Sequence, residues 1–417
     1  MNKKTLRDVS LAGKRVIMRV DFNVPIKDGV ISDDTRIQGA LPSIRHVLDQ
    51  GASLILMSHL GRPSGKGYEA DFSLEPVAAY LAKLLNKPVA FARECHKAGA
   101  QAEMLKPGQI LMLDNTRFLK EEEGSVKKKD DQTEEDYKAK KAEMKDKQKA
   151  LAQTFASYAD VFCNDAFGSA HRAHASTAVI CKFMKDNVAG FLMEKELEYL
   201  GTAVESPRRP FVAILGGAKV SDKLAVIKNL LGKVDTLIIG GGMAYTFLKA
   251  QGFAIGKSLC QDDQLDYARE MLALAKANKV NLLLPVDNIA ADKFAADAAT
   301  QVVGNTIPDG WMALDIGPKS TELFANAIAS AKTVVWNGPM GCFEMPAFAQ
   351  GTTGVCKAVA KIKTNGGVSV IGGGDSVSAV NNSGLADQMS HISTGGGASL
   401  EFLEGKELPG VAALSDK

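Results

Sequence analysis

The sequence predicts an α/β fold with two doubly wound parallel-sheet domains. The chain has 417 residues, which is long for one hydrophobic core and ordinary for two domains. Short runs rich in β-branched and aliphatic residues recur along it, and longer segments with helical spacing of apolar residues lie between them. This alternation is typical of parallel sheets with helices on both faces.

The predicted strands fall into two groups. Those of the first half are residues 15–20, 53–57, 109–113 and 159–163, and those of the second half are residues 211–215, 236–239, 281–284, 333–336 and 368–371. Each run is apolar on both faces, as expected for strands that are covered on two sides. Segments such as 74–85 and 224–231 have helical spacing. We therefore expect two Rossmann-like domains.

The expected domains are residues 1–189 and 190–399. An amphipathic stretch at 190–197 predicts a connecting helix and a hinge, and Pro207-Arg208-Arg209-Pro210 then enters the second domain. Lys alternates with Glu and Asp in residues 120–149, which favours an exposed helix or a mobile excursion over a binding patch.

Composition excludes several classes of function. A formal net charge of +2 and 6% aromatic residues argue against a nucleic-acid binder that relies on bulk charge or base stacking. We expect no signal peptide, because no apolar run follows the basic N-terminus, and no membrane span, because no apolar stretch is long enough. The six cysteines are scattered without a C-x-x-C pair, as in reduced core residues of a cytoplasmic protein.

In the first half, polar and often basic residues follow the strands. Ligands of parallel sheets bind beyond the carboxyl ends of the strands, so these residues predict a cleft for a small anion that carries phosphate, carboxylate or both. Each arginine could instead make a surface ion pair. His171 and His174 favour a phosphate contact or a structural role over a metal site, because no third ligand is near. The residues are Asp21, Asn23, Arg36, His59, Gly61, Arg62, Asn115, Arg117, Asn164, Asp165, His171, Arg172 and His174.

In the second half, the strand ends are glycine-rich instead. Glycine lets a backbone approach phosphate closely, and the next helix offers its N-terminal amides. Four such turns in one domain predict a nucleotide site. They are residues 216–217, 240–242, 337–341 and 372–376.

Lys219 and Lys223 strengthen this prediction. Val220, Leu224 and Ile227 indicate a helix, and the two lysines, four residues apart, are expected to share one face at its start. Cations are unfavourable at a helix N-terminus, so a bound polyanion is favoured over plain solvent exposure.

Two acidic residues also lie near these turns. Asp375 is either a helix N-cap, with Ser376 as the alternative cap, or a ligand of Mg²⁺ beside nucleotide phosphates. Glu344 is a weaker candidate for a ribose contact.

Familiar nucleotide motifs are absent. Residues 252–258 approach a Walker A loop but have one residue too few between the glycines, and no G-x-G-x-x-G fingerprint follows a strand. The missing fingerprint argues against a nicotinamide-dependent dehydrogenase, which also pairs two α/β domains.

The chain resembles the phosphoglycerate kinases. The resemblance runs, in order, through RVDFNVP (19–25), SHLGRP (58–63), NDAFGSAHRAH (164–174), LGGAKVSDK (215–223), WNGPMG (336–341), GGGDS (372–376) and STGGGAS (393–399). The family often has threonine where this chain has Ser376, which keeps the hydroxyl.

The resemblance implies two binding sites. The first domain would bind 3-phosphoglycerate, and the tail from residue 400 to 417 would pack back on that domain. The second domain would bind ATP or ADP with Mg²⁺ on Asp375. Substrate-binding residues would be Asp21, Phe22, Asn23, Arg36, His59, Leu60, Gly61, Arg62, Arg117 and Arg172. Nucleotide-binding residues would be Gly217, Ala218, Lys219, Lys223, Gly241, Asn337, Pro339, Glu344, Gly372, Gly373, Gly374, Asp375 and Ser376.

The implied reaction is reversible phosphoryl transfer between ATP and the carboxylate of 3-phosphoglycerate, by a cytoplasmic, monomeric enzyme. The catalytic residues would be Arg36, Lys219, Gly373 and Gly396. Arg36 and Lys219 would meet the moving group from opposite domains after a hinge motion. The presence of Arg36, Lys219 and Asp375 argues against a non-catalytic nucleotide-binding module.

Overall fold

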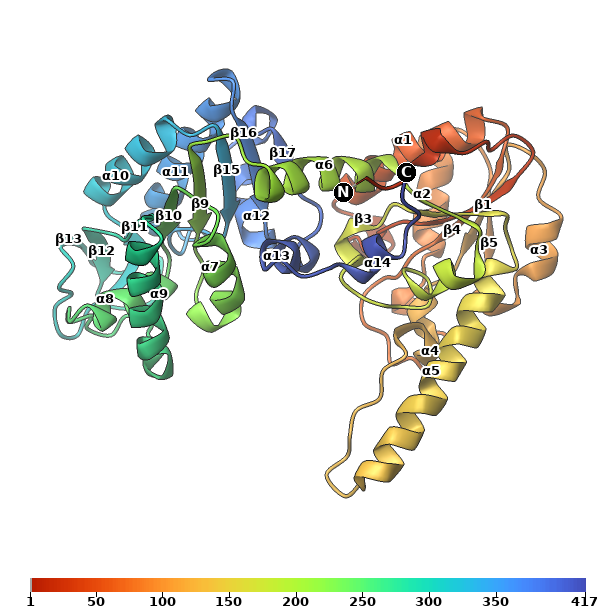
Figure 1. Cartoon of the computed structure of the whole chain (residues 1–417), viewed down its shortest axis with the longest axis horizontal. Helices are drawn as coiled ribbons and strands as arrows, with labels where there is room; N and C mark the ends of the chain where they lie inside the picture. The colour runs from red at the N-terminus through yellow and green to blue at the C-terminus, as the bar shows by residue number, and fades with distance from the viewer. Residues whose placement is uncertain (1) are drawn as a thin grey trace. The chain divides into compact units, whose positions relative to one another are not determined.

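The computed structural model describes residues 2–417, which form two compact units (Figure 1). Unit 1 is the chain up to Leu197 together with Glu407–Lys417, and unit 2 is Glu198–Lys406. The division falls within helix α6 (Phe191–Glu205), so the predicted connecting segment is helical.

Unit 1 contains a six-stranded parallel sheet in the order β5-β6-β4-β1-β7-β8. The two edge strands were absent from the prediction. β8 begins with the polar pair Asp186 and Asn187, and β5 is only partly buried, so neither gives a continuous apolar run. The strands are β1 (Arg15–Arg19), β4 (Ser53–Met57), β5 (Val89–Ala92), β6 (Ile110–Leu113), β7 (Val161–Asn164) and β8 (Asp186–Ala189).

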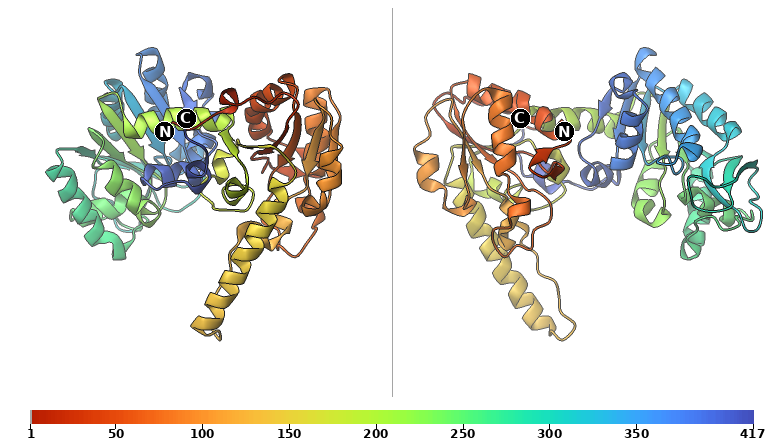
Figure 2. Two further views of the ribbon diagram at one scale, coloured as in Figure 1. Left: turned by 45° about the vertical axis from the view of Figure 1, so that its right-hand side comes forward. Right: turned by 180° about the vertical axis from the view of Figure 1, so that it is seen from behind.

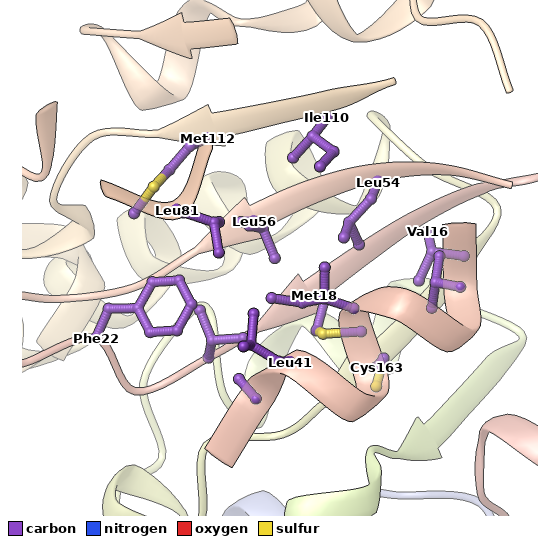
Figure 3. Packing of buried hydrophobic residues seen from close by; sticks show 14 of the residues in the cluster. Val16, Met18, Phe22, Leu41, Leu54, Leu56, Leu81, Ile110, Met112 and Cys163 are labelled. Carbon is purple, nitrogen blue, oxygen red and sulfur yellow. The ribbon is translucent and has the colours of Figure 1, made fainter. Parts of the chain in front are cut away.

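Apolar side chains of this sheet and of its helices form the core of unit 1. Met18, Leu56 and Met112 come from three neighbouring strands and pack with Leu41 of α1 and Leu81 of α2 (Figure 3). A short hairpin of β2 (Ile26–Lys27) and β3 (Val30–Ile31) follows β1. The helices are α1 (Thr35–Asp49), α2 (Glu75–Leu85), α3 (Gly99–Glu103), α4 (Lys120–Glu123), α5 (Glu134–Ala156) and α14 (Pro409–Ala412).

The charged stretch predicted at 120–149 is largely helical. Thr133 caps α5 by accepting a hydrogen bond from the backbone N–H of Asp136 (3.1 Å). The buried residues of α5 all lie in its C-terminal part, from Gln148 to Ala156. The N-terminal part therefore extends away from the sheet of unit 1, as two views show (Figures 1 and 2).

The last residues of the chain complete unit 1. The Asn164 side-chain amide, at the end of β7, donates to the carbonyl of Gly410 (3.0 Å). The ammonium group of Lys3 lies 2.8 Å from the carboxylate of Asp416. The C-terminal segment thus packs on elements from the beginning of the sequence.

Unit 2 contains a second parallel sheet, in the order β11-β10-β9-β15-β16-β17. With two parallel sheets flanked by helices, the predicted fold class is confirmed. The strands are β9 (Phe211–Leu215), β10 (Thr236–Ile239), β11 (Asn281–Leu283), β15 (Thr333–Asn337), β16 (Val368–Gly372) and β17 (His391–Ile392). The helices are α7 (Leu224–Leu230), α8 (Met243–Ala250), α9 (Leu265–Ala277), α10 (Pro318–Ala329), α11 (Gln350–Thr364), α12 (Gly374–Asn382) and α13 (Gly397–Leu403).

Unit 2 also carries a three-stranded antiparallel sheet that the sequence reading missed. Its order is β13-β12-β14, with β12 (Asn288–Ala291), β13 (Thr300–Val303) and β14 (Met312–Ile316). The edge strand β13 is mostly exposed, so its residues show no apolar run.

Two further findings, on membrane spans and on cysteines, concern the residues that the structure describes. None of its helices is both long and apolar enough to cross a membrane. Its six cysteines are free thiols, four of them buried, as the scattered spacing predicts.

Candidate functional site

The polar residues predicted in the first half gather at the carboxyl ends of β1, β4, β6 and β7. The guanidinium Nη1 of Arg36 donates to Asp21 Oδ1 (3.2 Å) and to the carbonyl of Asn23 (3.1 Å). The side-chain oxygen of Asn23 accepts from the backbone N–H of Gly61 (2.8 Å), which links the loop after β1 to the loop after β4. These contacts order both loops around Arg36.

Three further arginines lie at this edge. Arg117 donates to the carbonyl of Gly61 (3.1 Å), and its buried Nε has no hydrogen-bond partner among residues 2–417. Arg62 and Arg172 are exposed, and across residues 2–417 the side chain of neither makes a hydrogen bond or an ion pair. Unpaired guanidinium groups at one sheet edge suit a small anion.

Ion pairs also occur there, as the alternative interpretation expected. Arg36 lies 3.2 Å from Asp21 Oδ2, and Arg117 Nε lies 3.5 Å from Glu123. Burial lowers the pKa of Arg117, and Glu123 and Glu122 oppose this effect.

Phe22 and Leu60 are candidates whose side chains turn inward. Phe22 is fully buried among core residues, and its backbone N–H donates to Ser58 Oγ (2.9 Å) (Figure 3). The carbonyl of Leu60 accepts from the side-chain amide of Asn115 (2.6 Å). These two residues could therefore contact a ligand only through backbone atoms or through the small exposed part of the Leu60 side chain.

A buried charged network lies beneath the arginines, and sequence reasoning missed it. Arg19 and Glu122 are both fully buried. The Nε of Arg19 donates to Ser176 Oγ (2.8 Å), and that hydroxyl donates to Glu122. Nη2 of Arg19 lies 3.2 Å from Nδ1 of His59. Arg19 is part of an apolar run and Glu122 part of a charged run, so their pairing gives no local signal.

His174 belongs to this network. Its Nδ1 lies 3.9 Å from Glu122, and burial lowers its pKa to about 3, helped by Arg117 and Arg19. Among residues 2–417, no group of three or more His, Cys, Asp or Glu side chains is arranged to hold a metal ion.

In unit 2, the predicted glycine turns pack against one another at the carboxyl ends of β9, β10 and β15. The N–H of Gly217 donates to the carbonyl of Pro339 (3.0 Å), and the N–H of Gly241 donates to that of Met340 (3.0 Å). A Cβ on Gly241 would lie 2.6 Å from the nitrogen of Gly217 and 2.8 Å from the oxygen of Pro339. This close packing requires glycine, and the φ of +67° at Gly241 also favours it.

Asn337 connects these turns to Lys223 and to the end of β16. Its Oδ1 accepts a hydrogen bond from the ammonium group of Lys223. Its Nδ2 is buried and has no hydrogen-bond partner among residues 2–417, and a Cβ added to Gly373 would lie 3.1 Å from it. A buried amide donor that lacks an acceptor suits a site that a ligand oxygen completes.

The two lysines do not share a face, contrary to the prediction. Residues 220–223 form a 3₁₀ helix, in which residues four apart point in different directions because a turn takes three residues. Lys219 precedes this helix and is exposed, whereas Lys223 is buried. Burial lowers the pKa of Lys223 to about 8, and Asp222 and Asp375 oppose this effect.

Neither Asp375 nor Ser376 caps a helix, so that interpretation was wrong. Helix α12 begins after Gly373, whose positive φ (+87°) turns the chain, and no side chain caps it. Ser376 Oγ instead accepts from the backbone N–H of Gly338. Asp375 is exposed in the first turn of α12, and Glu344 is exposed in the loop after β15. One free carboxylate is enough for Mg²⁺ that also binds phosphate oxygens.

The last glycine loop lies beside the end of β16. Gly396 has a φ of +48° and precedes α13. Ser399 lies in the first turn of α13, near Gly372. A Cβ added to Gly372 would be 3.5 Å from the Cβ of Ser399. The candidates Gly372, Gly373 and Gly396 therefore belong to neighbouring turns. Ala218 and Gly374 are exposed within the same set of turns.

Known proteins resemble this chain over its whole length. Residues 6–406 match the family model described as phosphoglycerate kinase. Phosphoglycerate kinases of Clostridium tetani and Chloroherpeton thalassium are 52% and 54% identical to it; each alignment covers all of this chain and 98% and 100% of the relative.

Solved structures agree with the sequence comparisons. The phosphoglycerate kinase of Coxiella burnetii has a TM-score of 0.86 at 42% identity, and that of Pyrococcus horikoshii has a TM-score of 0.78 at 31% identity. Each comparison covers 99% of this chain and 98% of the other.

Proposed function

Because this chain belongs to the phosphoglycerate kinase family, we propose that it transfers a phosphoryl group reversibly between ATP and the carboxylate of 3-phosphoglycerate. The products are ADP and 1,3-bisphosphoglycerate, and the reaction is a step of glycolysis and gluconeogenesis. The arrangement around Asn337 is the observation that supports the kinase assignment best. A buried lysine, an amide donor without an acceptor and close-packed glycine turns meet there, as a polyphosphate ligand requires.

Unit 1 is the proposed site of 3-phosphoglycerate. Among residues 2–417, the guanidinium groups of Arg62 and Arg172 make no hydrogen bond or ion pair, and Nε of Arg117 makes no hydrogen bond. Arg36 is ordered by Asp21 and Asn23. Phosphate and carboxylate both accept paired hydrogen bonds from guanidinium groups, so this set matches an acceptor that carries both.

The proposed step needs no general base. The acceptor carboxylate is already ionised near neutrality, because carboxyl groups of this kind have a pKa of about 4. What the step requires is positive charge around the moving phosphoryl group and exclusion of water. Arg36 and Lys219 supply that charge in our proposal, and the backbone amides near Gly373 and Gly396 add donors. In-line transfer also requires contact between the two ligands, so the proposal includes a hinge closure.

Mg²⁺ would be bound together with the nucleotide. Asp375 is the carboxylate in unit 2 that would hold it, because this side chain is exposed at the start of α12 without an ion pair among the described residues. When bound, the ion neutralises charge on the phosphates.

A coupled assay of ATP-dependent phosphorylation of 3-phosphoglycerate, with and without Mg²⁺, tests the proposal. We expect turnover that depends on Mg²⁺ and on both substrates. If MgATP binds in calorimetry but 3-phosphoglycerate is not phosphorylated, the assignment of the acceptor is wrong. If MgATP does not bind, the nucleotide assignment is wrong.

A further inference from the structure

The buried pair of Arg19 and Glu122 lies directly behind His59, one of the predicted substrate-binding residues. Arg19 comes from β1, His59 follows β4, and Glu122 lies in the short helix α4. All three side chains are buried, and His59 keeps only 6% of its surface exposed. Two charges in such a place need compensation, because isolated buried charges are strongly destabilising.

Two neighbouring residues, Ser176 and Thr116, hold the carboxyl group of Glu122. Its Oε2 accepts from the backbone N–H of Ser176 (3.1 Å), and its Oε1 accepts from the Ser176 hydroxyl and lies 3.3 Å from the hydroxyl of Thr116. Burial raises the pKa of Glu122, whereas Arg19 and the hydrogen bonds from Ser176 and Thr116 lower it and favour the ionised form. Through Ser176, Glu122 fixes the Nε end of Arg19 and supplies its countercharge.

Arg19 in turn determines which ring nitrogen of His59 carries the proton. A guanidinium group only donates hydrogen bonds, so Nδ1 of His59 must accept from Nη2 of Arg19. A neutral ring with an accepting Nδ1 carries its proton on Nε2. No acceptor within residues 2–417 bonds Nε2, and Nε2 is not among their buried atoms that lack a partner. Its N–H is thus available to a ligand.

The groups around His59 favour this neutral form. Burial lowers its pKa well below the usual value, and the cations Arg19, Arg117 and Arg36 and the neighbouring His174 lower it further. They come from β1, the turn after β6, α1 and the loop after β7. A second proton on His59 would face these cations and would compete with the donor of Arg19.

We propose that Arg19, held by Glu122 through Ser176, is a positioning residue that keeps His59 in the neutral Nε2–H form and so presents a fixed hydrogen-bond donor to the anionic substrate. This inference rests on the proposed function of unit 1 as the binding site of 3-phosphoglycerate. In this arrangement, His59 contributes a directed donor and the arginines contribute the charge.

The protonation state of His59 can be measured without substrate. Long-range ¹H–¹⁵N spectra of the full chain, labelled with ¹⁵N-histidine, distinguish the two neutral tautomers and the imidazolium. The chain has six histidines, and His59→Gln identifies the signal. We expect the Nε2–H pattern from pH 5.5 to pH 8. An Nδ1–H pattern, or titration with a midpoint near 6.5, would overturn the proposal.

Charge-removing variants separate positioning from stability. Arg19→Met removes the donor, and Glu122→Gln removes the countercharge. We expect each to raise the KM for 3-phosphoglycerate about tenfold, as for one lost hydrogen bond to a charged group, and to change kcat much less. Arg15→Met, on the same strand but beside Asp160, is the matched control and should leave KM unchanged.

The double variant Arg19→Met/Glu122→Gln is decisive. Removal of both buried charges should recover most of the stability that a single substitution loses. If the pair only stabilised the fold, the KM for 3-phosphoglycerate would return to that of the unsubstituted chain together with the stability. We expect instead that the KM stays raised and that His59 no longer shows a single tautomer.

If the single charge variants do not fold, Ser176→Ala applies the same test. This variant keeps both charges and removes the bridging hydroxyl. A KM and a His59 spectrum like those of the unsubstituted chain would refute the proposal. Because the spectra require no substrate, a chain that shows the expected tautomer but no turnover would refute the proposed function alone.

Discussion

The two parallel sheets present opposite chemistry at equivalent edges. At the strand ends of unit 1 the polar groups are side chains, chiefly arginines, with a buried network of charged and polar side chains behind them. In unit 2 they are mainly backbone groups of glycine turns, with Lys223 and Asn337 as the buried polar side chains. In our proposal, the same arrangement of strands serves recognition by side-chain charge in unit 1 and by close backbone approach in unit 2. The two modes should fail in different ways when they are mutated.

The largest effect is expected for a side-chain deletion in unit 1. Arg36→Ala should lower kcat about 10²- to 10³-fold, as for loss of a preorganised donor to the transition state, and should leave the Kd for MgATP nearly unchanged. Steady-state kinetics and calorimetry measure the two quantities. Arg45→Ala removes an exposed arginine of the same helix and serves as the control. An unchanged kcat in Arg36→Ala would remove Arg36 from the proposed mechanism.

A side-chain addition should be the most damaging change in unit 2. Gly241→Ala places a Cβ against the backbone of Gly217 and Pro339 at a positive φ, so the turns must separate. We expect nucleotide affinity to fall roughly 100-fold, equivalent to about 3 kcal/mol, with little change in 3-phosphoglycerate binding. Gly232→Ala, whose nearest contact would be an ordinary 3.5 Å, is the control. Equal losses in both variants would contradict the close-packing argument.

Nucleotide binding should be accompanied by uptake of a proton by Lys223. Its pKa of about 8 leaves it partly neutral at pH 8, and a bound polyanion favours the charged form, so the pKa rises on binding. We expect uptake of about half a proton at pH 8 and almost none at pH 6, where Lys223 is already charged. Calorimetry in buffers of different ionisation enthalpy measures it. Lys223→Arg, which stays charged, should show no such uptake; persistence of the signal there would assign the proton to another group.

The smallest effect is expected for a residue that lies outside both proposed binding sites. Glu143→Ala breaks an exposed pair with Lys147 (2.7 Å) on the N-terminal part of α5. We expect the midpoint of thermal unfolding and the kinetics to stay unchanged, because exposed ion pairs contribute little to stability. A large loss of activity would show that this part of α5 serves one of the two sites.

The sequence predicted features that have a local signal. Central strands such as 53–57 and 211–215 appear as apolar runs because both of their faces are covered. Membership of the phosphoglycerate kinase family was confirmed. The roles of individual site residues, including Arg36 and Asp375, stay predictions.

Features that depend on tertiary contacts could not be predicted from the sequence. The link from Arg19 through Ser176 to Glu122 joins a strand to a charged helix, and the local sequence around each residue does not indicate its partner. The burial of Lys223 follows from a 3₁₀ turn and from Asn337 on a strand far away in the sequence. Strand β13 depends on pairing with β12 and not on its own hydrophobicity.

The return of residues 407–417 to unit 1 has a consequence for synthesis. A ribosome makes unit 2 as one continuous segment, whereas the contacts of unit 1 from Asn164 to Gly410 and from Lys3 to Asp416 cannot form until residues 407–417 emerge. Domains usually fold in the order in which they are made. Here the unit that is begun first is completed last, and chains that stop short of Gly410 leave it unfinished.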